Sequence, residues 1–160
     1  MKMARFVALA ALGVTAFAVQ AKPAPAPAAP SAAQLVAARQ AAMALSATSV
    51  NLLKGASANG MPLKSLAFSA NGLAKWAAAM PALFADSTKG ISPRAKAEIW
   101  TNKADFTAKA DAFTQATKAL AAAAAAEDKD AFASALASVG GACKGCHDSY
   151  QAPPPAKPAG

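Results

Sequence analysis

The chain has 160 residues, of which 15% are charged, and its 16 basic and 8 acidic residues give a formal net charge of +8. This length predicts one domain of ordinary size. Alanine is abundant, aromatic residues are few, and no segment alternates polar and apolar residues long enough for a sheet, so the composition argues against a β-rich fold and favours helices.

The first 21 residues have the three parts of a secretory signal peptide. Lys2 and Arg5 supply the positive charge, residues 6–19 form an apolar stretch, and residues 19–21 (VQA) suit cleavage. A membrane anchor is the weaker alternative, because a span needs about 18 or more apolar residues. We therefore expect export to the periplasm of a Gram-negative bacterium, without stable insertion in the membrane.

Removal of the signal peptide would leave 14 basic and 8 acidic residues. Such a balance could indicate nucleic acid, but the lysines are scattered rather than clustered, and an exported protein rarely meets nucleic acid. We interpret the lysines as a solvated surface that steers an acidic redox partner, and we expect no nucleic-acid partner.

Two proline-rich segments flank the expected domain, which covers residues 31–150. Residues 22–30 (KPAPAPAAP) form a tether and residues 151–160 (QAPPPAKPAG) form a tail, and neither can bury surface. The domain between them contains four segments with the apolar periodicity of amphipathic helices.

The first two predicted helices cover about residues 31–54 and 63–80. Ser31 is a good N-cap for the first, and Gly55 is its expected stop. Pro81 should end the second. One face of the first helix carries residues at spacings of three and four: Val36, Arg39, Met43, Ser46, Val50 and Leu53.

The third predicted helix begins with Ser92 as N-cap and Pro93 in the first turn, and its apolar face extends to Ala124. Residues 127–129 form the tight turn that follows. The fourth helix has both cysteines on its apolar face, which consists of Phe132, Leu136, Val139, Cys143, Cys146 and Tyr150. Four such helices with short connections predict an all-α, antiparallel four-helix bundle.

The segment 143–147 (CKGCH) is the attachment motif of a c-type haem. Cys143 and Cys146 are about one helical turn apart and can reach two vinyl groups on one porphyrin edge, while His147 directs its imidazole at the iron. The chain contains only these two cysteines and this one histidine. We therefore predict one covalent haem c per chain, with His147 as the metal ligand.

A disulfide and a zinc site are the alternatives to haem. A redox disulfide of the thioredoxin type needs a strand–loop–helix setting, whereas this motif lies inside a helical pattern. A zinc site needs a fourth ligand, and the chain has no spare cysteine or histidine.

Arg39 and Met43, one helical turn apart, are the further candidates for haem contact. An unpaired charge on an apolar face is costly, so Arg39 either binds a haem propionate or extends along its stem into solvent. Met43 either faces the iron opposite His147 or belongs to the core. Met61 and Met80 lie near helix ends and are poorer candidates.

Gly140 and Gly141 precede the haem motif although glycine is a poor helix former. Close approach of a flat ring or of a neighbouring backbone would explain them, and a helix kink is the alternative.

Residues 31–151 resemble the cytochrome c′ family. The resemblance rests on 39–43 (RQAAM), 81–84 (PALF), 98–100 (EIW) and above all 140–150 (GGACKGCHDSY), because the haem motif stands near the C-terminus. It implies a four-helix bundle with haem in its core, often a homodimer through the first two helices. It also implies that Arg39 lies near a propionate and that Met43 faces the distal side of the haem.

One residue departs from the family pattern. Gln151 stands where the family usually carries Arg or Lys, close to the proximal histidine. This departure argues against proximal gas chemistry that uses such a charge.

Two functions remain open at this point. In the first, the iron is five-coordinate beneath Met43, and the protein transfers electrons and binds NO or CO. In the second, the Met43 sulfur ligates the iron of a low-spin electron carrier with no gas role. No distal acid–base pair of the peroxidase kind is present unless Arg39 turns inward, so we do not expect an enzyme.

Overall fold

The computed structural model describes residues 28–92 and 94–154. The predicted signal peptide and most of the predicted tether and tail lie outside these residues. The elements, in chain order, are α1 (Ala32–Ala58), α2 (Leu63–Ala79), the 3-10 helices η1 (Met80–Phe84) and η2 (Asp86–Thr88), α3 (Glu98–Thr101), α4 (Lys103–Ala126) and α5 (Lys129–Tyr150).

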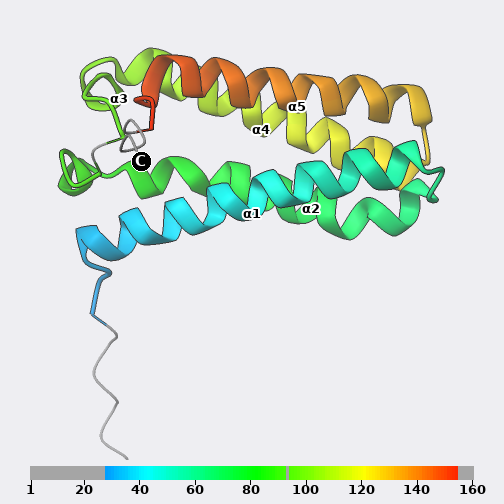
Figure 1. Cartoon of the computed structure of the whole chain (residues 1–160), viewed down its shortest axis with the longest axis horizontal. Helices are drawn as coiled ribbons and strands as arrows, with labels where there is room; N and C mark the ends of the chain where they lie inside the picture. The colour runs from blue at the N-terminus through cyan, green and yellow to red at the C-terminus, as the bar shows by residue number, and fades with distance from the viewer. Residues whose placement is uncertain (1–27, 93, 155–160) are drawn as a thin grey trace, which may run out of the picture.

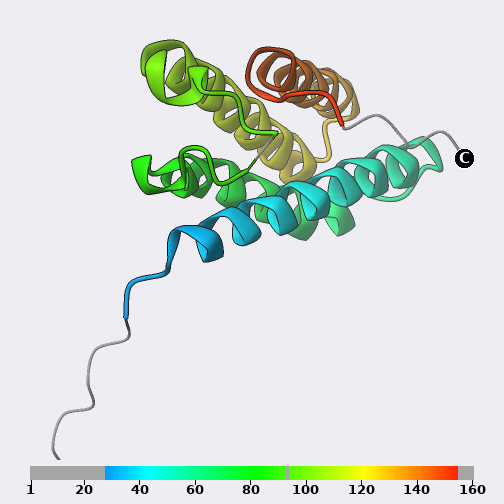
Figure 2. The ribbon, with the colours of Figure 1, turned by 60° about the vertical axis from the view of Figure 1, so that its left-hand side comes forward.

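The four long helices form two layers, with α1 and α2 in one and α4 and α5 in the other (Figure 1). The turned view in Figure 2 shows the same pairing. The short turns after α1 and α4 lie at one end of the bundle, and the longer segment 80–102 lies at the other, so neighbours along the chain run antiparallel. The predicted all-α four-helix bundle is confirmed.

The start of α1 is as predicted, but its end is not. Ser31 forms a full capping box with Gln34, because each side chain accepts a hydrogen bond from the other's backbone N–H. The prediction that Gly55 stops the helix is wrong. The helix continues through Gly55 to Ala58, and the chain turns at Gly60, whose φ of 74° is open to glycine without strain.

The predicted start of the third helix is also wrong. Ser92 is buried and caps no helix, and residue 93 lies outside the described residues. The chain after Ser92 instead pairs with the end of α5, through an isolated antiparallel bridge between Ala95 and Gln151. Helical structure therefore begins only at α3, and Asn102, with φ −117° and ψ 58°, separates α3 from α4.

The turn between α4 and α5 is confirmed. Glu127 adopts the left-handed conformation at the end of α4, and Asp128 caps α5 by accepting a hydrogen bond from the Ala131 N–H. At the end of α2, Pro81 does stop the α-helix, but the chain continues as the 3-10 helix η1.

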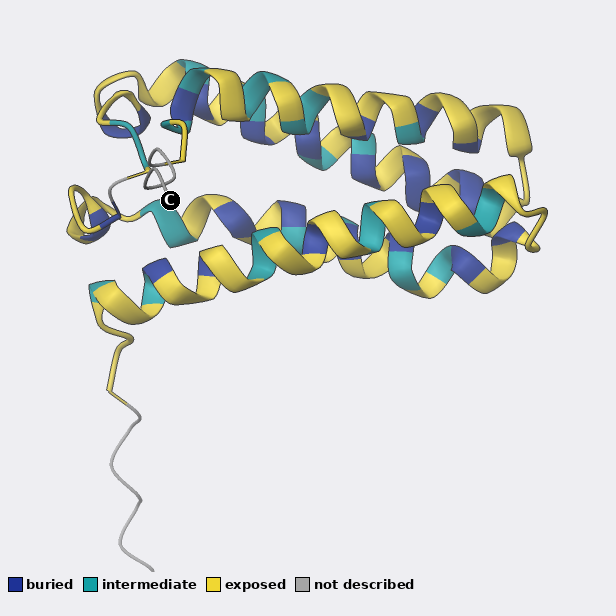
Figure 3. Ribbon diagram, viewed as in Figure 1, coloured by how far each residue is buried: buried dark blue, intermediate teal, exposed yellow. Residues whose placement is uncertain are grey.

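The core lies mainly among α2, α4 and α5, with the buried faces turned inward and the exposed faces outward (Figure 3). Leu53, Leu120 and Val139 are completely buried. Across the part of the chain that the structure describes, none of the helices has the length and apolar character that crossing a membrane requires.

Candidate functional site

The haem motif lies in the last two turns of α5. The helix is unbroken from Lys129 to Tyr150, so Cys143 and Cys146 lie three residues apart on one face and His147 lies one turn after Cys143. Both cysteines are half-buried and neither is in a disulfide. The disulfide alternative thus has no support in the structure.

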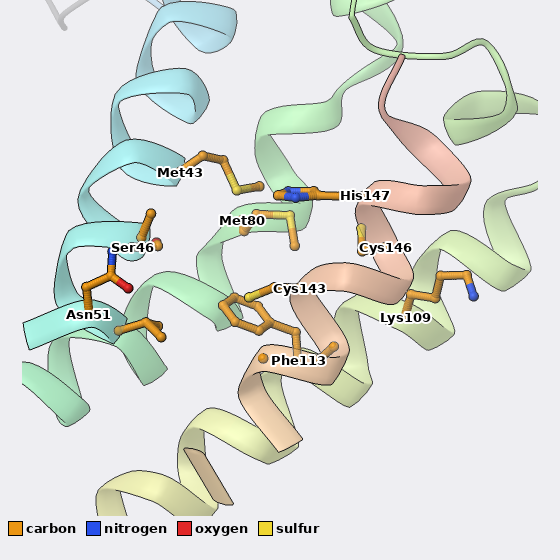
Figure 4. Close-up of a pocket in the computed structure, with 13 residues that line it drawn as sticks. Met43, Ser46, Asn51, Met80, Lys109, Phe113, Cys143, Cys146 and His147 are labelled. Atoms are coloured by element: carbon orange, nitrogen blue, oxygen red, sulfur yellow. The ribbon is translucent and has the colours of Figure 1, made fainter. Parts of the chain in front are cut away.

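A cavity of about 260 Å³ lies directly against the motif. Both cysteines and His147 line it from α5, and Met43 lines it from α1. Figure 4 shows the Met43 and His147 side chains reaching toward each other across this space. The remaining wall is largely apolar, with Met80 from the start of η1 and Phe113 from α4, and this is the lining that a flat, mostly apolar group requires.

A second cavity, of about 350 Å³, also borders His147. It shares Met43, Cys146 and His147 with the first cavity, so the two spaces adjoin at the predicted iron ligand. Its wall also contains the guanidinium-bearing residues Arg39 and Arg94. The first cavity is therefore mainly apolar, with Lys109 as the one cationic residue among the described residues that line it, and the second has two guanidinium groups in its wall.

Arg39 is buried, with 4% of its surface exposed, so the alternative that it extends into solvent is wrong. Its Nη1 donates hydrogen bonds to the Leu83 carbonyl at 3.2 Å and to the Thr88 hydroxyl at 3.1 Å. Its Nη2 is buried with no hydrogen-bond partner. Burial without an acidic partner lowers the pKa of Arg39. An anion in the second cavity would supply the partner that this buried cation lacks.

A chain of aromatic contacts connects Arg39 to the end of α5. The Arg39 guanidinium lies 4.6 Å from the Phe84 ring centre. Phe84 and Phe106 meet edge to face at 5.0 Å, as do Phe106 and Tyr150 at 5.3 Å. Through these contacts, α1, η1, α4 and α5 share one wall of the second cavity.

Tyr150 is 5% exposed, and its hydroxyl donates a hydrogen bond to Asp105 Oδ2 at 2.5 Å. Burial, together with the hydrogen bond to Asp105, raises the pKa of Tyr150 to about 12. Tyr150 therefore stays protonated at physiological pH and ties α5 to α4 one turn after His147.

Burial raises the pKa of both cysteine thiols, and for Cys146 the nearby Lys109 partly opposes this effect. Burial therefore disfavours the thiolate form of both side chains.

Gly140 borders the first cavity, and a Cβ built there would meet no atom within 4 Å. The same holds for Gly141. The prediction that a neighbouring backbone approaches these glycines is therefore wrong, and α5 continues through both as one helix. Close approach of a flat ring stays a prediction, supported by the open space beside Gly140.

Sequence reasoning passed over part of this site. The sequence favours Met43 over Met80, yet Met80 is 2% exposed and lines the same cavity as Met43. Phe84 enters the sequence analysis only as part of the family segment 81–84, and Asp105 is not among its candidates. Met80 and Phe84 lie in η1 and Asp105 lies in α4, and only the folded bundle brings these segments to the site.

Comparison with known proteins gives consistent results. The sequence profile described as cytochrome C′ matches residues 34–151. The cytochrome c′ of Pararhodospirillum photometricum is 44% identical over 73 residues, which cover 45% of this chain and 58% of that protein. That of Cereibacter sphaeroides is 45% identical over 71 residues, covering 44% and 46% respectively. The matched segments span about half the length of these relatives.

Solved structures extend the similarity to most of the chain. Cytochrome c′ from Thermochromatium tepidum superposes with a TM-score of 0.72 at 34% identity, over 79% of this chain and 100% of that one. The nitric oxide complex of a variant of cytochrome c prime from Alcaligenes xylosoxidans superposes with a TM-score of 0.70 at 30% identity, over 77% and 98%.

Proposed function

The chain belongs to the cytochrome c′ family, and from that premise we propose that it is a periplasmic electron-transfer haem protein with a five-coordinate iron that binds NO and CO. Members of this family carry covalently bound haem c. The proposed attachment points are Cys143 and Cys146, and the proposed metal ligand is His147.

The residues present fit this cofactor. Two thiols and an imidazole face one largely apolar cavity, and the buried, unpartnered Nη2 of Arg39 belongs to a residue in the wall of the adjoining one. When bound, the haem supplies an iron that accepts and releases one electron and can take a diatomic ligand. The thiols would hold the group, and Arg39 would pair with a propionate.

The placement of Met43 carries the proposal of gas binding. Met43 is half-buried on α1 and reaches toward His147 from the opposite side of the cavity (Figure 4). We propose that its side chain limits the space and excludes water there without ligating the iron. The NO complex of the Alcaligenes xylosoxidans variant supports a gas ligand in this fold.

The ferric and ferrous spectra test this proposal. We expect a high-spin ferric species that takes up CO on reduction. A thioether-to-iron charge-transfer band, low spin in both oxidation states and slow CO uptake would instead make Met43 the sixth ligand. The protein would then be the low-spin electron carrier with no gas role.

Two matched variants sharpen this test, because Met43 and Met80 both line the cavity. If Met43 ligates the iron, Met43→Ala converts the protein to high spin, whereas Met80→Ala leaves it low-spin. If neither sulfur ligates, both variants stay high-spin, and Met43→Ala binds CO faster because the space beside the iron is larger.

We also propose a homodimer through α1 and α2. These helices expose large apolar side chains, with Leu45 67% and Leu52 51% exposed on α1 and Phe68 90% exposed on α2. Leu45 and Leu52 lie seven residues apart and so share a face. Sedimentation should show a dimer that Phe68→Ser weakens, and a monomeric wild-type protein would contradict the proposal.

A further inference from the structure

The C-terminus of α5 has no glycine cap in the left-handed conformation. The last four carbonyls of a helix have no partner within it, and a glycine in the left-handed conformation commonly helps to satisfy them. Here the C-cap is Gln151, in an extended conformation with φ −113° and ψ 124°. Its N–H donates a hydrogen bond to the His147 carbonyl at 2.9 Å, which leaves the carbonyls of residues 148–150.

One residue from outside the helix satisfies all three of these carbonyls. Lys96 Nζ donates hydrogen bonds to the carbonyls of Asp148 at 3.1 Å and Ser149 at 3.2 Å. The backbone N–H of Lys96 donates to the Tyr150 carbonyl at 3.0 Å. The ammonium group also places a positive charge at the helix C-terminus, where the helix dipole is negative.

The segment around Lys96 is itself fixed to the chain beyond the helix. The Ala152 N–H donates to the Arg94 carbonyl at 2.8 Å, and Arg94 Nε donates to the Ala152 carbonyl at 3.2 Å. On the α4 side, the Tyr150 hydroxyl is bound to Asp105. The turn that begins with His147 is therefore held on both sides.

We propose that Lys96 is a positioning residue for His147, acting through the carbonyls that it caps. It fixes the backbone of the turn from which the imidazole extends, and its charge offsets the negative end of the helix beside that imidazole. This inference rests on the proposed ligation of the iron by His147. It concerns the proximal side and does not depend on whether Met43 ligates.

The test compares Lys96→Met with Lys96→Arg in the haem-loaded protein. Lys96→Met removes the ammonium donor, so the amides of residues 148–152 should exchange hydrogen about tenfold faster. The iron–histidine vibrational band and the haem midpoint potential should both shift. Lys96→Arg, which keeps a cationic donor, should restore all three properties. If Lys96→Met yields no protein, Lys96→Gln, which keeps a neutral donor, replaces it.

Lys103→Met is the matched control. Lys103 is an exposed lysine whose ammonium group pairs with Asp86 at 3.0 Å rather than with a carbonyl of α5, so its loss should change none of the three properties. Unchanged exchange in Lys96→Met would overturn the inference. Faster exchange with an unchanged iron–histidine band would also overturn it, because Lys96 would then only cap the helix. A high-spin ferrous wild-type protein without an iron–histidine band would contradict the proposed ligation itself, and the inference with it.

Discussion

Helix α5 has two very different flanks. On the side of α4 it packs tightly, with Phe132 and Val139 buried against a core that includes Leu120 and Ala124. On the side of α1, cavities of about 260 and 350 Å³ lie against its last turns. The two flanks of this one helix therefore have different roles. Its closed flank holds the bundle together, and its open flank is where we propose that the haem binds.

The composition of the helices explains this difference. Three alanines in the last turns of α4 are buried, and such small side chains let helices approach closely. In α1, by contrast, Arg39 and Ser46 are two of only four buried residues. Polar groups on an inner face cannot pack as a hydrocarbon core does, so they need specific partners. Arg39 has only some of the hydrogen-bond partners that it needs, because its Nη2 has none.

The largest expected effect comes from removing the covalent attachment on the open flank. Cys143→Ser together with Cys146→Ser should abolish stable holoprotein, because no thioether can then form. Acidic organic extraction should leave haem with the wild-type protein, and the wild-type mass should include the haem. Haem that moves to the organic phase from wild-type protein would contradict the covalent attachment.

Truncation on the closed flank should have the next largest effect. Leu120 is fully buried, so Leu120→Ala should lower the free energy of unfolding by about 2–5 kcal/mol. On α1, Ser46→Ala removes only a hydroxyl that donates to its own helix at Ala42, and it should cost less than about 1 kcal/mol. Denaturant unfolding measures both. Equal costs would show that the two flanks contribute equally to stability.

Arg39→Leu tests what the positive charge in the wall of the second cavity does to the haem. Loss of a buried positive charge near the haem favours the ferric state, so the midpoint potential should fall by about 40 mV, which corresponds to about 1 kcal/mol for one electron. Redox titration measures this shift, and Arg39→Lys should recover part of it. An unchanged potential would indicate that Arg39 serves only Leu83, Thr88 and Phe84.

The last prediction concerns pH. The pKa of Tyr150 is raised to about 12 in the folded chain, against about 10 when unfolded. The folded state therefore binds more protons than the unfolded state between these values, and stability should fall as pH rises from 10 to 12. Tyr150→Phe should remove this part of the decline in denaturant titrations. An identical pH dependence in both proteins would exclude Tyr150 as its source.

Local signals in the sequence predict much of this protein. The Ser31 cap, the turn at residues 127–129 and the periodic apolar faces specify the four helices, because each depends on residues only a few positions apart. The haem motif is equally local, since its three functional residues lie within five positions on one helix. These features are sufficient to predict the all-α fold class and the haem attachment motif.

The features that depend on the tertiary structure involve residues far apart in the chain. Ser92 is a residue type that often caps a helix, but the pairing of Ala95 with Gln151 overrides this local preference for a helix start. Arg39 finds Thr88, 49 positions away, and Lys96 finds the Asp148 carbonyl, 52 positions away. A sequence pattern registers only spacing along one helix, whereas these contacts exist because packing brings separate segments together. The partners of Arg39, the cavities beside His147 and the capping of α5 by Lys96 therefore depend on the folded bundle.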